Sequence, residues 1–295
     1  MQAIKNGFRF IGASLSLALK KIKLQEPWFA LGLGGLVILF VWFLPIGSVV
    51  KWIGLTPLGL TLLGILAVLA LADLILWGEI TSLLTARTFA ALDSEEAAGN
   101  ISNLKFLGTH GGAVVLLALT LPLLSLGSSL RGLFARPEAA PDERSRWLEA
   151  RTLALPITAI EGTPFPMTLD RLRQIVNENL MRFREDLIAV RLAAGLIESL
   201  LIAGGIILGF AVGLKIANPA TVGPWQRVLA AGIAMLIAWV PTIIGIMFSS
   251  FSRACYATAL YQWVCNVAEA RASDGAAKTQ PPAILAQVLG TVSQR

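Results

Sequence analysis

An acidic side chain, Glu198, lies inside a long apolar run that extends from residue 190 to residue 213. A charge at the centre of a bilayer costs about 2.5–3.5 kcal/mol on insertion scales, so such residues often mark a functional site. Arg191 lies seven residues earlier on the same helical face, about 10 Å away along the axis, which makes direct pairing doubtful. The sequence favours a hydrogen bond between helices, with Thr242 or Ser249 as the partner of Glu198, over transport, proton movement or a buried subunit contact.

The chain has one histidine, His110, which precedes the apolar run of residues 111–130. An imidazole at this place can bind a metal or a chlorin, or titrate near neutrality. A metal site made by protein groups alone needs further ligands, and no second histidine or carboxylate cluster accompanies it. Cys255 and Cys265 are ten residues apart, about 15 Å on a helix, so they form neither a disulfide nor a ligand pair. We therefore predict a hydrogen-bonded histidine at the membrane boundary, and no metal, cofactor or catalytic site.

Three glycines follow one another at intervals of four residues in the same run as Glu198: Gly205, Gly209 and Gly213. On a helix this spacing produces a face without side chains, which a second helix can approach closely. The expected neighbour is another segment of this chain, and a second subunit is the alternative.

Membrane helices must position these residues. Of the 295 residues, 56% are hydrophobic and 14% charged, whereas about a quarter of residues are charged in soluble proteins. Five apolar runs are about as long as the roughly 20 residues that a spanning helix needs: 28–50, 55–77, 111–130, 190–213 and 227–248. The third run is less convincing because it carries Pro122 and Gly127. Asp73, four residues before Trp77, is expected at the membrane interface. The five runs predict an all-α, polytopic protein of the cell inner membrane.

An amphipathic helix is predicted ahead of each of two pairs of spans. In residues 168–190, apolar side chains recur every three or four positions and the opposite face is charged. The N-terminal segment repeats this pattern, with five basic residues: Lys5, Arg9, Lys20, Lys21 and Lys23. We expect both helices to lie in the membrane interface, although a coiled-coil or partner-binding helix would have the same pattern. Each pair is followed by a further amphipathic segment, 81–92 or 251–264, so the two hairpins follow one plan at an offset of about 165–170 residues.

Basic residues predict the orientation, because those in short loops stay on the cytoplasmic side. If the middle of the chain returns to its starting side, only Lys51, Lys215 and Arg227 of the 24 basic residues lie outside. A single ordinary span at 111–130 would reverse this bias. We predict both termini in the cytoplasm and a middle element that is re-entrant, broken at Pro122, or crosses twice by way of residues 147–162.

The predicted chain has four parts. Residues 1–110 hold the first amphipathic helix and hairpin, and residues 111–167 hold the middle membrane element and a polar linker. Residues 168–270 hold the second amphipathic helix, the second hairpin and a helix after the last span. Residues 271–295 are expected to form a mobile tail.

Two short segments carry a resemblance to known proteins. ATALYQW, residues 257–263, follows the last span, and a motif precedes the second amphipathic helix at Pro156, Glu161, Gly162 and Pro164. In these segments the chain resembles a family of uncharacterised prokaryotic polytopic membrane proteins, a domain of unknown function. It is also loosely similar to the membrane region of some glycerophosphodiester phosphodiesterases. The resemblance implies six spans, which favours two middle crossings, although Glu149 and Arg151 depart from it, and it implies no activity.

The expected function is that of a membrane subunit without enzymatic activity, with a structural, interaction or assembly role. The alternative is a small transporter or lipid-handling permease, which Glu198 and the repeated hairpins also suit. The net charge of +6 suits anionic lipid headgroups at the cytoplasmic face and requires no nucleic acid. Other membrane subunits, or a second copy of the chain, are the expected protein partners.

Overall fold

The computed structural model contains helices and no strand in the part of the chain that it describes. That part comprises residues 2–21, 24–35, 49, 53–93, 101, 106, 108, 110–116, 151–177, 184–216, 223–272, 282 and 284–286. The α-helices are α1 (Gln2–Lys20), α3 (Pro57–Asp93), α7 (Ala154–Glu161), α8 (Phe165–Asn177), α9 (Arg184–Ile216) and α10 (Pro224–Ala272), and a 3-10 turn, η1 (Arg151–Leu153), precedes α7. Residues 24–35 and 110–116 are also helical. The predicted all-α class is confirmed.

Three of these helices are long and apolar enough to cross a membrane: Pro57–Leu92, Val190–Ile216 and Gly232–Ala270. They correspond to the second, fourth and fifth predicted spans, so the protein belongs to the helical membrane class. The predicted spans 28–50 and 111–130 are described only at residues 28–35 and 111–116. The remainder of both, and the polar linker with Glu149, lie outside the described residues, as does most of the tail 271–295.

Helices α3 and α10 continue well past the spans that the sequence predicts. They contain 37 and 49 residues, which corresponds to about 55 Å and about 73 Å of helix. Segments 81–92 and 251–264, predicted as amphipathic pieces after the spans, are helical and form continuous parts of α3 and α10. Even Pro241 lies inside α10 without ending it.

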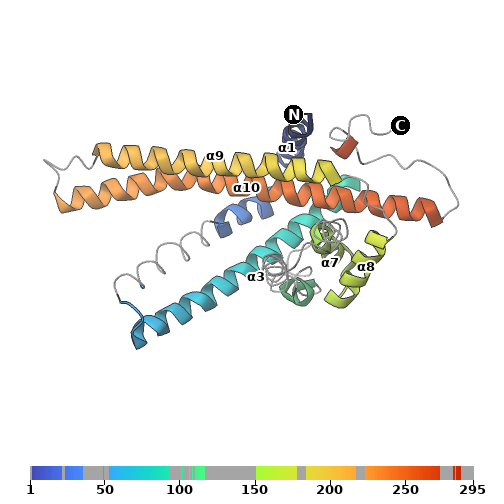
Figure 1. Cartoon of the computed structure of the whole chain (residues 1–295), viewed down its shortest axis with the longest axis horizontal. Helices are drawn as coiled ribbons and strands as arrows, with labels where there is room; N and C mark the ends of the chain where they lie inside the picture. The colour runs from blue at the N-terminus through green and yellow to red at the C-terminus, as the bar shows by residue number, and fades with distance from the viewer. Residues whose placement is uncertain are drawn as a thin grey trace, which may run out of the picture.

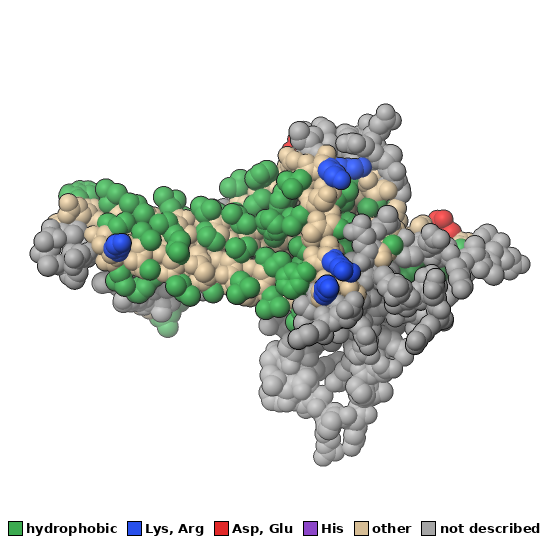
Figure 2. Space-filling model, turned by 90° about the horizontal axis from the view of Figure 1, so that it is seen from above, with side chains coloured by type: hydrophobic (Ala, Val, Ile, Leu, Met, Phe, Trp, Pro, Cys, Tyr) green, Lys and Arg blue, Asp and Glu red, His purple; other side chains and the backbone are tan. Residues whose placement is uncertain are grey.

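Each long helix has an exposed apolar part and a buried part. Large apolar side chains are exposed in the first half of α3, the second half of α9 and the first half of α10, for example Val68, Phe210 and Leu236. Figure 2, seen from above, shows apolar side chains along the face that it draws, with Lys and Arg side chains near the two ends of that stretch. The other parts pack into a shared core that includes Phe10, Trp28, Leu84, Ile157, Ile175, Phe251 and Tyr261. At one end of the molecule the helices therefore expose apolar side chains, and at the other end they pack into a closed core.

Helices α9 and α10 lie side by side and antiparallel along most of their length (Figure 1). A Cβ added at Gly205 would lie 2.7 Å from the carbonyl oxygen of Ala238. One added at Gly209 would collide with the carbonyl oxygen of Ala234, and one at Gly213 would lie 2.8 Å from the Ala234 Cβ. The neighbour on the glycine face of α9 is therefore α10 of the same chain.

Helix α1 packs against α9 and α10. Phe10 stacks edge-on against Tyr256 with ring centroids 5.3 Å apart, and the hydroxyl oxygens of Ser14 and Ser252 are 3.3 Å apart. Spacing in the sequence predicts an apolar stripe of Ile4, Phe8, Ile11, Leu15, Leu19 and Ile22. Of these, Ile11 is buried, whereas Phe8 and Leu19 are exposed. The buried face of α1 is thus rotated from that stripe, because it follows the position of α9 and α10 rather than hydrophobicity alone.

The amphipathic segment 168–190 is divided between two helices. Helix α8 ends at Asn177 and α9 begins at Arg184, and the two point in different directions (Figure 1). Leu172 and Ile175 of α8 are buried in the shared core, whereas α9 pairs with α10. A single uninterrupted helix through this segment, as the periodicity predicted, is therefore wrong.

We predict that Gly209→Ala weakens the α9–α10 pair, because its new methyl group would meet the Ala234 carbonyl oxygen. Overpacking of this kind costs about 1–3 kcal/mol. Gly204→Ala is the matched control on the same helix, since a Cβ there meets nothing within 4 Å, and alanine has the higher helix propensity. Thermal unfolding in detergent measures both variants. Equal unfolding temperatures for the two variants would contradict close packing at Gly209.

Candidate functional site

Glu198 forms an ion pair with Arg253 of α10. Its Oε2 accepts a hydrogen bond from Arg253 Nη2 at 3.0 Å, and the two side chains are 27% and 49% exposed. Thr242, one of the predicted partners, instead donates to the carbonyl oxygen of Ala238. The partner prediction was wrong because Arg253 is 55 positions away and only the antiparallel packing of α9 on α10 brings it to Glu198.

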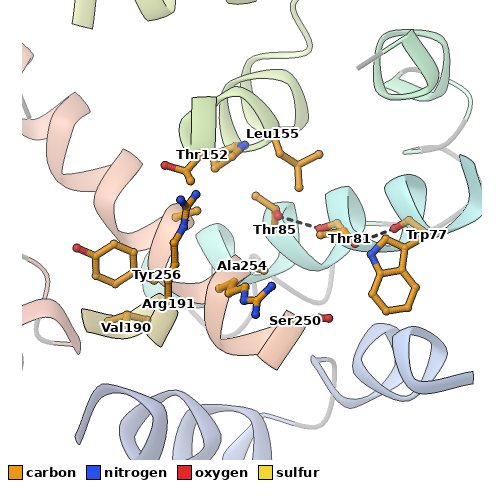
Figure 3. Close-up of a pocket in the computed structure, with 13 residues that line it drawn as sticks. Trp77, Thr81, Thr85, Thr152, Leu155, Val190, Arg191, Ser250, Ala254 and Tyr256 are labelled. Atoms are coloured by element: carbon orange, nitrogen blue, oxygen red, sulfur yellow. Dashed lines mark hydrogen bonds between the residues drawn. The ribbon is translucent and has the colours of Figure 1, made fainter. Parts of the chain in front are cut away.

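A cavity of about 250 Å³ lies beside this pair, where α3, η1, α7, α9 and α10 meet. Its wall contains both arginines, several hydroxyl groups and one indole ring: Arg191, Arg253, Thr81, Thr85, Thr152, Ser250, Tyr256 and Trp77. Figure 3 shows Arg191 extending toward Thr152 across the cavity. Arg191, the other candidate residue, lines this cavity together with Arg253, whereas Glu198 is connected to it through its ion pair with Arg253.

The cavity is electropositive. Two guanidinium groups line it, and none of its described lining residues is acidic. The Thr81 hydroxyl donates to the Trp77 carbonyl oxygen at 2.7 Å, and the Thr85 hydroxyl donates to the Thr81 carbonyl oxygen at 2.8 Å (Figure 3). These two hydroxyl hydrogens are used within α3, whereas the two guanidinium groups bring charged N–H donors to the wall.

Residues 24–35 are tied to both long helices by polar contacts. Arg87 Nη1 of α3 lies 2.9 Å from Glu26 Oε2, and the Trp28 indole N–H donates to the Met247 carbonyl oxygen of α10 at 3.0 Å. Lys21 also donates to the Ala91 carbonyl oxygen at 2.9 Å. These contacts hold the entrance to the first predicted span against the buried parts of α3 and α10.

The two segments that carry the family resemblance contact each other. The Tyr261 hydroxyl, within ATALYQW, donates to Glu161 Oε1, and Arg171 Nε of α8 lies 3.5 Å from the same oxygen. Gly162 follows with φ of 65° and donates its N–H to the Thr158 carbonyl oxygen, which ends α7. Glu161 and Gly162 therefore both have structural roles. Glu161 joins α7, α8 and α10, and Gly162 adopts a left-handed backbone that ends α7.

His110 lies over the end of α7. Its ring stacks on Phe106 with centroids 4.6 Å apart, its Nδ1 is 3.3 Å from the Phe106 carbonyl oxygen, and a Cβ at Gly162 would lie 3.0 Å from its Nε2. Within the described residues, no group of three or more His, Cys, Asp or Glu side chains is placed to hold a metal ion. Cys255 and Cys265 are both free thiols.

Two acidic residues of α3 were not recognised as buried from the sequence. Asp73 and Glu79 are each 7% exposed, and Asp73 Oδ2 and Glu79 Oε2 have no hydrogen-bond partner among the described residues. The protein itself covers the side chain of Asp73, which the sequence placed at the membrane interface without indicating its burial. Glu79 follows the apolar run by two residues, and only the continuation of α3 into the core shows that it is enclosed.

No protein-family model, curated protein or solved structure matches this chain. The family resemblance therefore stays a prediction, and the cavity and its ion pair must be interpreted from their own geometry.

We predict that Gly162→Ala destabilises the protein, because the left-handed backbone costs an L-residue about 1–2 kcal/mol and the new methyl group would press on His110. Gly162→Asn should cost less, since asparagine tolerates this conformation better. Gly112→Ala is the control next to His110, where a Cβ meets nothing within 4 Å. Thermal unfolding in detergent measures all three, and a Gly162→Ala protein as stable as the parent would show that the turn relaxes freely.

Proposed function

We propose that this chain is a membrane subunit without enzymatic activity, with a structural, interaction or assembly role. The observation that carries the proposal is the ion pair between Glu198 and Arg253. A carboxylate committed to a guanidinium on the neighbouring helix joins α9 to α10, whereas a transport site needs a carboxylate that can change partner. Glu198 therefore acts as a helix-joining residue.

Other charged residues support the same role. Arg87 joins α3 to the helix at residues 24–35 through Glu26, and Glu161 joins α7, α8 and α10 through Arg171 and Tyr261. The Val190–Ile216 span has only 11% of its most apolar window buried by the described residues. This leaves a large apolar surface for lipid or for another membrane subunit, including a second copy of the chain.

We place the protein in the cell inner membrane with both termini in the cytoplasm. The start of α3, the end of α9 and the start of α10 lie toward the same end of the molecule (Figure 1), so both hairpins would cross in the same sense. The basic side chains near the ends of the apolar surface (Figure 2) suit headgroup layers. In this arrangement α1 lies at the cytoplasmic face, with the exposed Phe8 and Leu19 toward lipid and Lys5 and Arg9 toward anionic headgroups.

The cavity favours a second candidate, a lipid-handling permease. A cavity lined by two guanidinium groups beside an exposed apolar surface suits a lipid headgroup, and α3, α9 and α10 all contribute residues to its wall. This role would require the headgroup to pass through the protein, in addition to binding there.

A charge exchange tests the helix-joining role. We expect Glu198→Gln to lower the unfolding temperature in detergent, because losing a partly exposed ion pair costs less than about 1 kcal/mol of stability. The double variant Glu198→Arg with Arg253→Glu should restore the unfolding temperature. Glu269→Gln, at an exposed position on α10, removes the same charge as a control. An exchange that fails to restore stability would show that the pair does not join the helices.

Native mass spectrometry of the protein, extracted gently from its own membrane, tests the role as a subunit. We expect a stoichiometric set of other membrane proteins, reduced in Glu198→Gln and regained in the charge exchange. Two results together would overturn the proposal in favour of the permease. The protein would be found without other proteins, and lipid flux in vesicles would be lost in Glu198→Gln and not regained in the charge exchange.

A further inference from the structure

Arg191 and Arg253 place two guanidinium groups on one small cavity. A guanidinium has five N–H donors in a planar fork that matches phosphate oxygens. Glu198 engages Arg253 through Nη2, which leaves the other N–H groups of this guanidinium, and the guanidinium of Arg191 is the second one on the same wall. An anion with several oxygens is the ligand that this arrangement suits.

The position of the cavity indicates where the anion comes from. It lies at the boundary between the exposed apolar parts of α3 and α9 and the buried core, with Trp77 in its wall. Indole rings favour the headgroup level of a bilayer. Leu76 and Leu192, adjacent to Trp77 and Arg191, and Leu196 one turn further on, are all exposed. Acyl chains can therefore lie against α3 and α9 while a headgroup enters between them.

The size of the cavity restricts what can enter. Its volume of about 250 Å³ is below the range of about 300–1,000 Å³ that encloses a drug-sized ligand. A phosphate with part of its glycerol suits this space, whereas a complete lipid does not. The acyl chains must therefore stay outside, on the apolar surface.

We propose that this cavity binds the phosphate headgroup of an anionic phospholipid through Arg191 and Arg253. A lipid held there contacts α3, η1, α9 and α10 at once, so binding stabilises their arrangement. The site is independent of the role proposed above, because a subunit and a permease can each hold such a lipid.

The test measures lipid binding to the full-length protein in a neutral detergent, by native mass spectrometry and by the unfolding temperature. The probes are dimyristoyl phosphatidylglycerol, dimyristoyl phosphatidylcholine and inorganic phosphate. We expect phosphatidylglycerol to bind and to raise the unfolding temperature, and phosphatidylcholine to bind at least tenfold more weakly because its headgroup has no net negative charge. Equal binding of both lipids would overturn the proposal. Inorganic phosphate that binds as tightly as phosphatidylglycerol would replace the lipid with a soluble anion.

Variants show whether the arginines carry the binding. Arg191→Gln leaves the Glu198–Arg253 pair in place and should weaken phosphatidylglycerol binding about tenfold, the usual effect of losing a charge-assisted hydrogen bond. Arg191→Lys keeps the charge without the planar fork, so its affinity for phosphatidylglycerol should lie between those of the parent protein and Arg191→Gln. Arg173→Gln is the control, since this exposed arginine of α8 pairs with Asp170 and does not line the cavity. Unchanged binding in both Arg191 variants, or an equal loss in Arg173→Gln, would overturn the site.

Discussion

The length of α3 and α10 relative to a bilayer is the constraint on which the structure depends. A hydrocarbon core is about 30 Å thick, whereas 37 and 49 residues form about 55 Å and about 73 Å of helix. Only part of each helix can therefore face lipid. The remainder lies beyond the hydrocarbon, where apolar side chains are stable only if protein covers them. This is why the core forms around the second half of α3 and the later part of α10, with α1, α7 and α8 packed around them.

The level at which the exposed and buried parts meet is where charged groups concentrate. Arg191 and Glu198 stand on turns of α9 that also carry the exposed Leu192, Leu196 and Leu200. Arg191 and Arg253 nevertheless line one cavity, and Glu198 pairs with Arg253. A guanidinium there can retain polar partners while its aliphatic stem stays against apolar surface. The ion pair joins α9 to α10 near the middle of α9, about three turns before Gly209, so a charge contact and close backbone packing fix the same helix pair at two separate levels.

The short helix α7 fixes the core from the middle of the chain. It ends at a glycine with φ of 65°, and this turn directs α8 away while Glu161 stays within reach of Tyr261 and Arg171. His110 covers the same turn from another segment. This short apolar helix therefore organises four helical segments, because it combines buried apolar side chains with specific polar and steric contacts at its end.

The sequence by itself determined the membrane class, the three long spans that the structure describes and the glycine spacing on α9. These features depend on local composition, since the free energy of transferring a helix to lipid is summed over consecutive residues. It did not predict that α3 and α10 continue past their spans. In α1, the buried face with Phe10 and Ser14 differed from the stripe that periodicity selected. Burial of Asp73 and Glu79 was also missed.

Only the tertiary structure decided that Arg253 is the partner of Glu198 and that Arg191 faces the same cavity. Residues 55 positions apart meet because α9 and α10 are antiparallel at one particular register, and that register results from how their surfaces pack. Periodicity along one helix gives the direction of each side chain relative to its own axis. The neighbour on that side, and hence the charge that it supplies, depends on the distance and rotation between helices, which no local pattern contains.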